Sequence, residues 1–176
     1  TPLIVTNFEY EIYVKNILNK LDIEAKLILE PIPKNTTAAI YLSAKLSQPD
    51  DDLLILPSDH LIKDINYFSK IVKKAFESKL VDQWIVFGII PSFASTGYGY
   101  LNVNNNAIMN EREELLKVYN FEEKPNKREA KKLVKNGSLW NSGIFMGNSE
   151  MIINSINKFA PEVALICNRI LNKQKE

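Results

Sequence analysis

The chain has 176 residues with 22 basic and 21 acidic side chains, which gives a formal net charge of +1. An apolar fraction of 45% and a charged fraction of 24% are typical of a folded globular chain and argue against intrinsic disorder. The near-zero charge also argues against a nucleic-acid partner, because affinity for a phosphate backbone comes from many clustered cations.

The cysteine content and the N-terminal residues exclude further classes of protein. One cysteine, Cys167, excludes an intrachain disulfide framework and a cysteine-rich zinc module. No apolar run is long enough to span a bilayer, so we expect no membrane partner. The opening residues TPLIVTNFEYEIYV lack the basic segment and apolar run of a secretory signal. We therefore expect a cytoplasmic protein.

Short apolar runs alternate with amphipathic stretches through the first half of the chain, which predicts βαβ units and a mainly parallel sheet. The predicted strands are Leu3–Val5, Ala25–Leu29, Leu53–Leu56 and Trp84–Gly88. The predicted helices follow Asn7, run from Thr36 to Leu46 behind an Asn35 cap, and begin at Asp64.

The second half is less regular. We predict strands at Tyr98–Val103, Leu116–Phe121 and Leu139–Met146, with the polar stretch NVNNNAIMNEREE as an exposed hairpin tip. Helices are expected over Asn126–Asn136 and over Ser149–Leu171, the latter interrupted near Pro161. No repeat or linker divides the chain, so residues 1–176 are taken as one domain.

The segment LLILPSDH (53–60) carries the strongest local signal. An apolar strand ends in a turn that bears Asp59, and open α/β sheets bind ligands beyond the carboxyl ends of their strands. A carboxylate there suits Mg²⁺ held against substrate phosphates, but Asp59 is equally well explained as the cap of the next helix. His60, the single histidine, has no visible catalytic partner, so we expect it to pack or hydrogen-bond beside Asp59.

Three weaker motifs also follow or begin predicted strands. Gly97–Tyr100 offers a close backbone approach, Glu122–Pro125 pairs acids with a lysine, and Trp140–Gly143 supplies an amide side chain. Taken singly, each is explained as a turn or a solvated charge cluster. Their shared position at strand ends favours a common site.

Five motifs taken in order resemble a known family. They are EPIPKNTTAAI (30–40), LLILPSDHLI (53–62), FGIIPSFASTGYGYL (87–101), FEEKP (121–125) and LWNSGIFM (139–146). Together they resemble mannose-1-phosphate guanylyltransferase, the GDP-mannose pyrophosphorylase branch of the sugar-phosphate nucleotidylyltransferases. The resemblance implies a Rossmann-like, three-layer nucleotidyltransferase fold with a mixed, mainly parallel central sheet.

The resemblance also implies an activity and a set of roles. The family transfers a guanylyl group from GTP to mannose 1-phosphate, giving GDP-mannose for polysaccharide biosynthesis and releasing pyrophosphate. By similarity, Asp59 holds the catalytic Mg²⁺, and Lys124 neutralises the sugar phosphate as the second catalytic residue. Gly99, Glu123 and Asn141 contact the sugar. Nucleotide binding is assigned to Glu30, Asn35, Thr36, Pro57 and Ser58.

One departure from the family qualifies this expectation. The family's glycine-rich loop, with its arginine and lysine, is not found among these residues, and we expect a partial domain, incomplete at both ends. We therefore expect little catalysis from this chain alone. Its partner is either a second copy of the chain, in a homo-oligomer, or a separately encoded segment that completes the domain, and both alternatives stay open. The alternatives are a degenerate, binding-only remnant and another nucleotide-sugar-dependent transferase domain, which would release no pyrophosphate.

Overall fold

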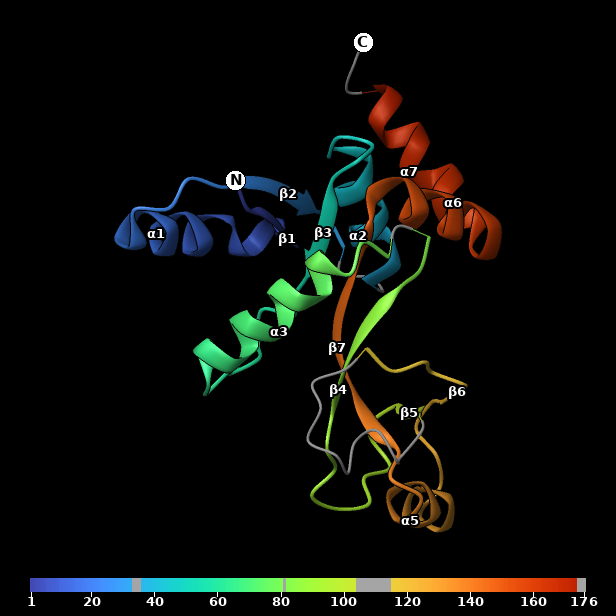
Figure 1. Ribbon diagram of the computed structural model, residues 1–176. Helices are drawn as coiled ribbons and strands as arrows, with labels where there is room; N and C mark the ends of the chain where they lie inside the picture. The colour runs from blue at the N-terminus through green and yellow to red at the C-terminus, as the bar shows by residue number, and fades with distance from the viewer. Residues whose placement is uncertain (33–35, 81, 104–114, 174–176) are drawn as a thin grey trace. The chain divides into compact units, whose positions relative to one another are not determined.

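The computed structural model describes residues 1–32, 36–80, 82–103 and 115–173 (Figure 1). The chain divides into two compact units. Unit 1 comprises residues 1–51 and 148–176, and unit 2 comprises residues 52–147. The helices and strands alternate along the chain, which confirms the predicted α/β class.

Unit 1 begins with a parallel strand pair, β1 (Leu3–Asn7) and β2 (Lys26–Glu30), in which Leu3 lies opposite Lys26. The 3₁₀ turn η1 (Phe8–Tyr10) and the helix α1 (Glu11–Leu21) connect them. As predicted, the Asn7 side chain caps this connection by accepting a hydrogen bond from the Glu9 backbone at 2.9 Å.

The other helices described in unit 1 are α2 (Thr36–Lys45), α6 (Ser149–Phe159) and α7 (Pro161–Lys173), and they pack on one another. Tyr41 of α2 is fully buried, and its hydroxyl donates to Asn157 Oδ1 at 3.1 Å and accepts from Asn168 Nδ2 at 3.0 Å. One hydroxyl thus joins all three helices. The break between α6 and α7 falls at Pro161, as predicted.

Unit 2 is a sheet built around the long strand β7 (Leu139–Asn148). The strand order is β3-β7-β5-β6, and β4 also pairs with β7, running alongside it in Figure 1. The other strands are β3 (Asp52–Ile55), β4 (Ile85–Ile89), β5 (Tyr100–Asn102) and β6 (Asn120–Glu122). The described residues of this unit form two helices, α3 (Ile65–Glu77) and α5 (Lys127–Lys135).

The described strand directions are mixed, as predicted. Of the four pairs whose registers are described, β1–β2 is parallel, whereas β4–β7, β5–β6 and β5–β7 are antiparallel. The direction of the β3–β7 pair is not among them, so the expected predominance of parallel pairing stays a prediction. The α/β alternation in the first half of the sequence predicted crossovers, but β7 returns from far along the chain and pairs with β4 and β5 in the opposite direction.

Local signals set the helix boundaries. Asp64 caps α3 by accepting from the Tyr67 backbone at 2.9 Å. Asn126 and Glu129 form a capping box at the start of α5, an arrangement that stabilises a helix by about 1 kcal/mol. The predicted Asn35 cap and most of the predicted hairpin tip lie outside the described residues. Among the described helices, none combines the length and apolar character needed to cross a membrane.

Candidate functional site

A row of residues crosses the sheet of unit 2 where three strands meet. Tyr100 of β5 pairs with Trp140 of β7 and with Glu122 of β6. The adjacent positions in that register are Gly99, Asn141 and Glu123. The Asn141 backbone N–H donates to the Gly99 carbonyl at 2.8 Å, and Gly88 of β4 lies opposite Asn141 on its other side. Three predicted sugar-binding residues are therefore neighbours across the strands.

The row lies on the face opposite the packed side of the sheet. Tyr100 and Trp140 belong to the buried cluster that contains Ala130 of α5. Side chains alternate between the two faces along a strand, so the row residues point to the other face. We call Glu123, Gly99 and Asn141 the polar row.

Gly99 leaves room for the acid of the polar row. A Cβ built on Gly99 would lie 2.8 Å from Glu123 Oε2 and 2.6 Å from Phe121 Cζ. Both distances are shorter than real Cβ contacts, so a side chain at position 99 would displace its neighbours. A side chain at position 99 would therefore push aside the exposed ends of Phe121 and Glu123, and glycine leaves both of them in place.

Asn141 presents its donors rather than its acceptor. Its side-chain Oδ1 accepts a hydrogen bond from the Gly143 backbone at 3.1 Å, and Gly143 adopts a left-handed φ of 74°. Within the residues that the structure describes, the Asn141 amide nitrogen has no assigned acceptor, and an amide carries two N–H donors. A ligand hydroxyl at the row can therefore accept from Asn141 and donate to the Glu123 carboxylate.

Lys124 brings a cation to the end of the polar row. Its Nζ lies 3.6 Å from Glu123 Oε1, and the two side chains are 65% and 57% exposed. An exposed pair of this kind contributes little to stability, so the ammonium is free to pair with an anion instead. Lys124 also has a left-handed φ of 44° directly before Pro125, an uncommon conformation for a residue with a side chain.

The turn after β3 belongs to the same unit. Pro57 is half-buried, and its Cγ would lie 3.6 Å from a Cβ built on Gly143, two residues beyond Asn141. Ser58 and Asp59 are exposed. Because Asp64 caps α3, capping does not explain Asp59. His60 is also exposed, so the packing alternative was wrong, and the hydrogen bond beside Asp59 stays a prediction.

Asp59 is the candidate metal ligand of unit 2. No group of three or more histidine, cysteine, aspartate or glutamate side chains gathers within the described part of the chain. A closed protein site for a cation is therefore not found among these residues. A single exposed carboxylate does fit Mg²⁺, which binds through one or two carboxylates and takes its remaining ligands from water and substrate phosphates.

The predicted nucleotide residues outside the turn belong to unit 1. Glu30 ends β2, Thr36 is the exposed first residue of α2, and Asn35 lies outside the described residues. Burial, and to a smaller extent the negative charge of Glu30, raises the pKa of the Cys167 thiol. Cys167 is 2% exposed and stays protonated, so it is not a reactive thiolate.

Sequence reasoning missed the residue next to the polar row on β4. Gly88 lies opposite Asn141, and a Cβ there would lie 2.6 Å from Leu139 Cδ1. The signal was a glycine inside an apolar strand, which indicates a close approach of neighbouring groups.

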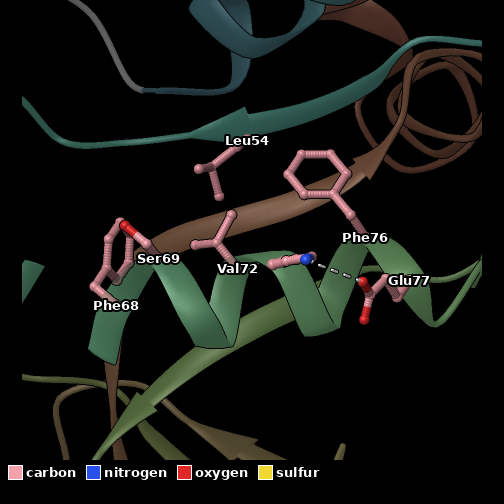
Figure 2. A pocket seen from close by; sticks show the side chains of 7 residues that line it. Leu54, Phe68, Ser69, Val72, Phe76 and Glu77 are labelled. Carbon is pink, nitrogen blue, oxygen red and sulfur yellow. Dashed lines mark ion pairs between the residues drawn. The ribbon is translucent and has the colours of Figure 1, made fainter. Parts of the chain in front are cut away.

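A separate apolar groove lies over α3 and has a volume of about 610 Å³. Figure 2 shows Phe68, Val72 and Phe76 facing Leu54 of β3. The predicted site residues do not line this groove, so it is distinct from the polar row.

Comparison with known proteins identifies the family. The nucleotidyl transferase family model matches residues 1–176. The chain belongs to the nucleotidyl transferase family. This nucleotidyl transferase is 32% identical over 179 residues to mannose-1-phosphate guanylyltransferase 2 of Escherichia coli O157:H7, covering 96% of the chain and 37% of that protein. It is 33% identical to mannose-1-phosphate guanylyltransferase RfbM of Salmonella typhimurium, covering 96% and 36%.

A solved structure is also similar to this chain. A Helicobacter pylori protein described as mannose-6-phosphate isomerase superposes with a TM-score of 0.84 at 30% identity, over 95% of this chain and 63% of that one. The similarity confirms the predicted family and fold. The chain spans a little over a third of the length of the two enzymes named above.

Proposed function

We propose that this nucleotidyl transferase binds mannose 1-phosphate at the polar row and takes part in guanylyl transfer from GTP, which yields GDP-mannose and pyrophosphate. The observation that carries the proposal is the juxtaposition of the Glu123 carboxylate, the Gly99 backbone and the Asn141 amide, with Lys124 at the end of the row. Relatives named mannose-1-phosphate guanylyltransferase support the choice of substrates.

Each group has a role that follows from its chemistry. Glu123 accepts hydrogen bonds from sugar hydroxyls, and Asn141 donates to them. Lys124 pairs with the phosphate of the sugar and reduces the repulsion between two reacting phosphates. Holding the sugar phosphate in one orientation is the main catalytic contribution, because phosphoryl-type transfer needs positioning and charge neutralisation more than protein nucleophiles.

Asp59 would hold a Mg²⁺ ion, which neutralises charge on the reacting phosphates when bound. We assign Glu30, Asn35, Thr36, Pro57 and Ser58 to nucleotide binding by resemblance alone. An Asp59→Asn exchange removes the anionic ligand while keeping the shape of the side chain. We expect pyrophosphate release, in this chain or in a longer chain that contains it, to fall by about 100-fold or more, a loss typical of removing a key charge-stabilising group.

The overall proposal is tested with GTP, mannose 1-phosphate and Mg²⁺. We expect saturable binding of mannose 1-phosphate and slow pyrophosphate release, because the Lys124 ammonium beside Glu123 neutralises only part of the charge of the reacting phosphates. Fast pyrophosphate release would contradict the expected slow rate but would support guanylyl transfer as the reaction. Binding without any release would favour a binding-only domain.

Two further outcomes favour other functions. Consumption of a nucleotide sugar without pyrophosphate would favour another transferase. Isomerisation of mannose 6-phosphate would favour the activity named for the Helicobacter pylori relative. Failure to bind mannose 1-phosphate would contradict the proposal.

A further inference from the structure

The back of the polar row contains a buried aromatic residue that the proposed function leaves unexplained. Trp140 immediately precedes Asn141 and is 9% exposed. Its side chain points to the face opposite the row, where it packs in the cluster with Tyr100 and Ala130. Among the described residues, the indole Nε1 has no hydrogen-bond partner. Within the described residues, therefore, no polar bond explains why position 140 is a tryptophan.

Two rings from the segment before β5 rest on Trp140. The ring centroids of Phe93 and Tyr98 each lie 4.9 Å from that of Trp140, tilted by 70° and 64°. Edge-to-face pairs at this separation are favourable beyond the area they bury. Phe93 and Tyr98 are themselves 58% and 47% exposed, so burial alone does not hold them in place.

Two hydrogen bonds also attach the segment 93–99 to the strands beside it. The buried Tyr100 hydroxyl donates to the Ser95 carbonyl at 2.8 Å, and the Ser95 hydroxyl accepts from the Gly97 backbone at 3.1 Å. At its end, the Gly99 carbonyl receives the Asn141 N–H. Trp140 and Tyr100 thus contact the segment 93–99 from the face of the sheet opposite the polar row. The last residue of that segment, Gly99, belongs to the row.

We propose that Trp140 is a positioning residue, which clamps Phe93 and Tyr98 and so fixes Gly99 and Asn141 for the sugar phosphate. The inference rests on the proposed function for its ligand but not for the clamp itself. Loosening the clamp frees Gly99 to move away from Asn141 and Glu123. Sugar-phosphate affinity then falls although no group that touches the ligand has changed.

The first test measures the clamp without any ligand. Hydrogen exchange of the Asn141 amide reports directly on its bond to Gly99. Trp140→Leu removes both ring contacts, and we expect the protection factor of that amide to fall about tenfold, as the loss of two aromatic pairs implies. Trp140→Phe should restore most of the protection, because a ring remains and Nε1 has no described partner to lose.

Two exposed positions keep the test decisive if Trp140→Leu fails to fold. Phe93→Ala and Tyr98→Ala each remove one ring from outside the core, and each should lower Asn141 protection by a few-fold. The matched control is Trp84→Phe, which changes the other tryptophan, in edge contact with Phe145 at 6.2 Å. That variant should leave Asn141 protection unchanged.

The second test measures mannose 1-phosphate affinity by calorimetry in the same variants. We expect a loss of about tenfold in Trp140→Leu, recovery in Trp140→Phe and no loss in Trp84→Phe. Unchanged exchange in Trp140→Leu, Phe93→Ala and Tyr98→Ala would overturn the clamp. Reduced protection with unchanged affinity would overturn its link to the ligand. If the unaltered chain binds no mannose 1-phosphate, the proposed function fails, while the exchange data still decide whether the clamp exists.

Discussion

The helical cluster of unit 1 and the polar row of unit 2 use their polar side chains in opposite ways. In the cluster, the Tyr41 hydroxyl is fully buried and pairs with Asn157 and Asn168. In the row, Glu123 is more than half exposed, as is Lys124 at the end of the row, and the two form an ion pair. One set of polar groups is used up in holding helices together, whereas the other remains available to a ligand.

The two regions also differ in how the space next to the backbone is filled. The helices of unit 1 meet through side chains such as Ile152 and Ala164, which fill the interior. The sheet at the row instead has glycine at positions 88 and 99, where a Cβ would collide with a neighbouring side chain. Glycine in these strands sacrifices packing, a cost that is understandable where a ligand or a functional side chain must approach the backbone closely.

The largest loss of mannose 1-phosphate affinity is expected from substituting Gly99. This substitution tests whether the residues around Gly99 form a binding site or only a turn. Gly99→Ala places a Cβ against Glu123 and Phe121, so the carboxylate must move. We expect mannose 1-phosphate affinity to fall by about 10- to 100-fold, since small misplacements in a positioned site are costly. Calorimetric titration measures the change.

Gly97→Ala is the matched control for this prediction. A Cβ at Gly97 would meet only Ser95 Oγ, at an ordinary 3.7 Å. Its affinity should stay within about twofold of the unaltered chain, as for most surface substitutions. Equal losses at positions 97 and 99 would show that the segment, rather than the space beside Glu123, determines binding.

A smaller effect is expected in unit 1, and on stability instead of affinity. Tyr41→Phe removes the hydroxyl shared by α6 and α7 and leaves two amide side chains without it. We expect the free energy of unfolding to fall by about 1–2 kcal/mol, measured by urea denaturation. Tyr13→Phe is the control, because Tyr13 is 67% exposed. A loss of sugar-phosphate affinity in Tyr41→Phe would contradict the assignment of binding to unit 2.

The smallest effect concerns pH. The pKa of Cys167 is raised above its ordinary value of 9.0, first by burial and then by the charge of Glu30. In the unfolded chain the thiol ionises at lower pH than in the folded chain. Its contribution to stability is therefore complete below pH 9.0 and decreases as pH rises through and above that value.

Cys167→Ala removes this contribution and should make the alkaline loss of stability less steep. Urea denaturation between about pH 8 and about pH 10 compares the two chains, whose other titrating groups are the same. A pH dependence unaltered by the substitution would show that Cys167 ionises equally easily in both states.

Local features of the fold were predictable from the sequence. Asp64, Asn126 and Pro161 mark helix boundaries through interactions within one turn of the helix, and all three were placed correctly. Strand directions were harder. β7 pairs with β4 across more than 50 residues of chain, and no local pattern states whether such a pair is parallel.

For the candidate site, the residues could be proposed from the sequence, but their arrangement could not. Gly99, Glu123 and Asn141 were proposed from motifs, but their arrangement in one row depends on the β5–β6 and β5–β7 registers. Asp59 was ambiguous because aspartate is a good cap; the structure gives the cap of α3 to Asp64, and the metal role of Asp59 stays a prediction. Gly88 was missed because its partner Asn141 is distant in sequence.

The most direct test of the polar row is a titration of the isotopically labelled chain with mannose 1-phosphate, followed by the backbone amide signals. The account predicts saturable shifts centred on Gly99, Glu123 and Asn141, with smaller changes at Gly88 and Gly143. The signals of α3 beside the apolar groove should stay in place. Shifts confined to α3 or to the helices of unit 1, with the row unmoved, would contradict it.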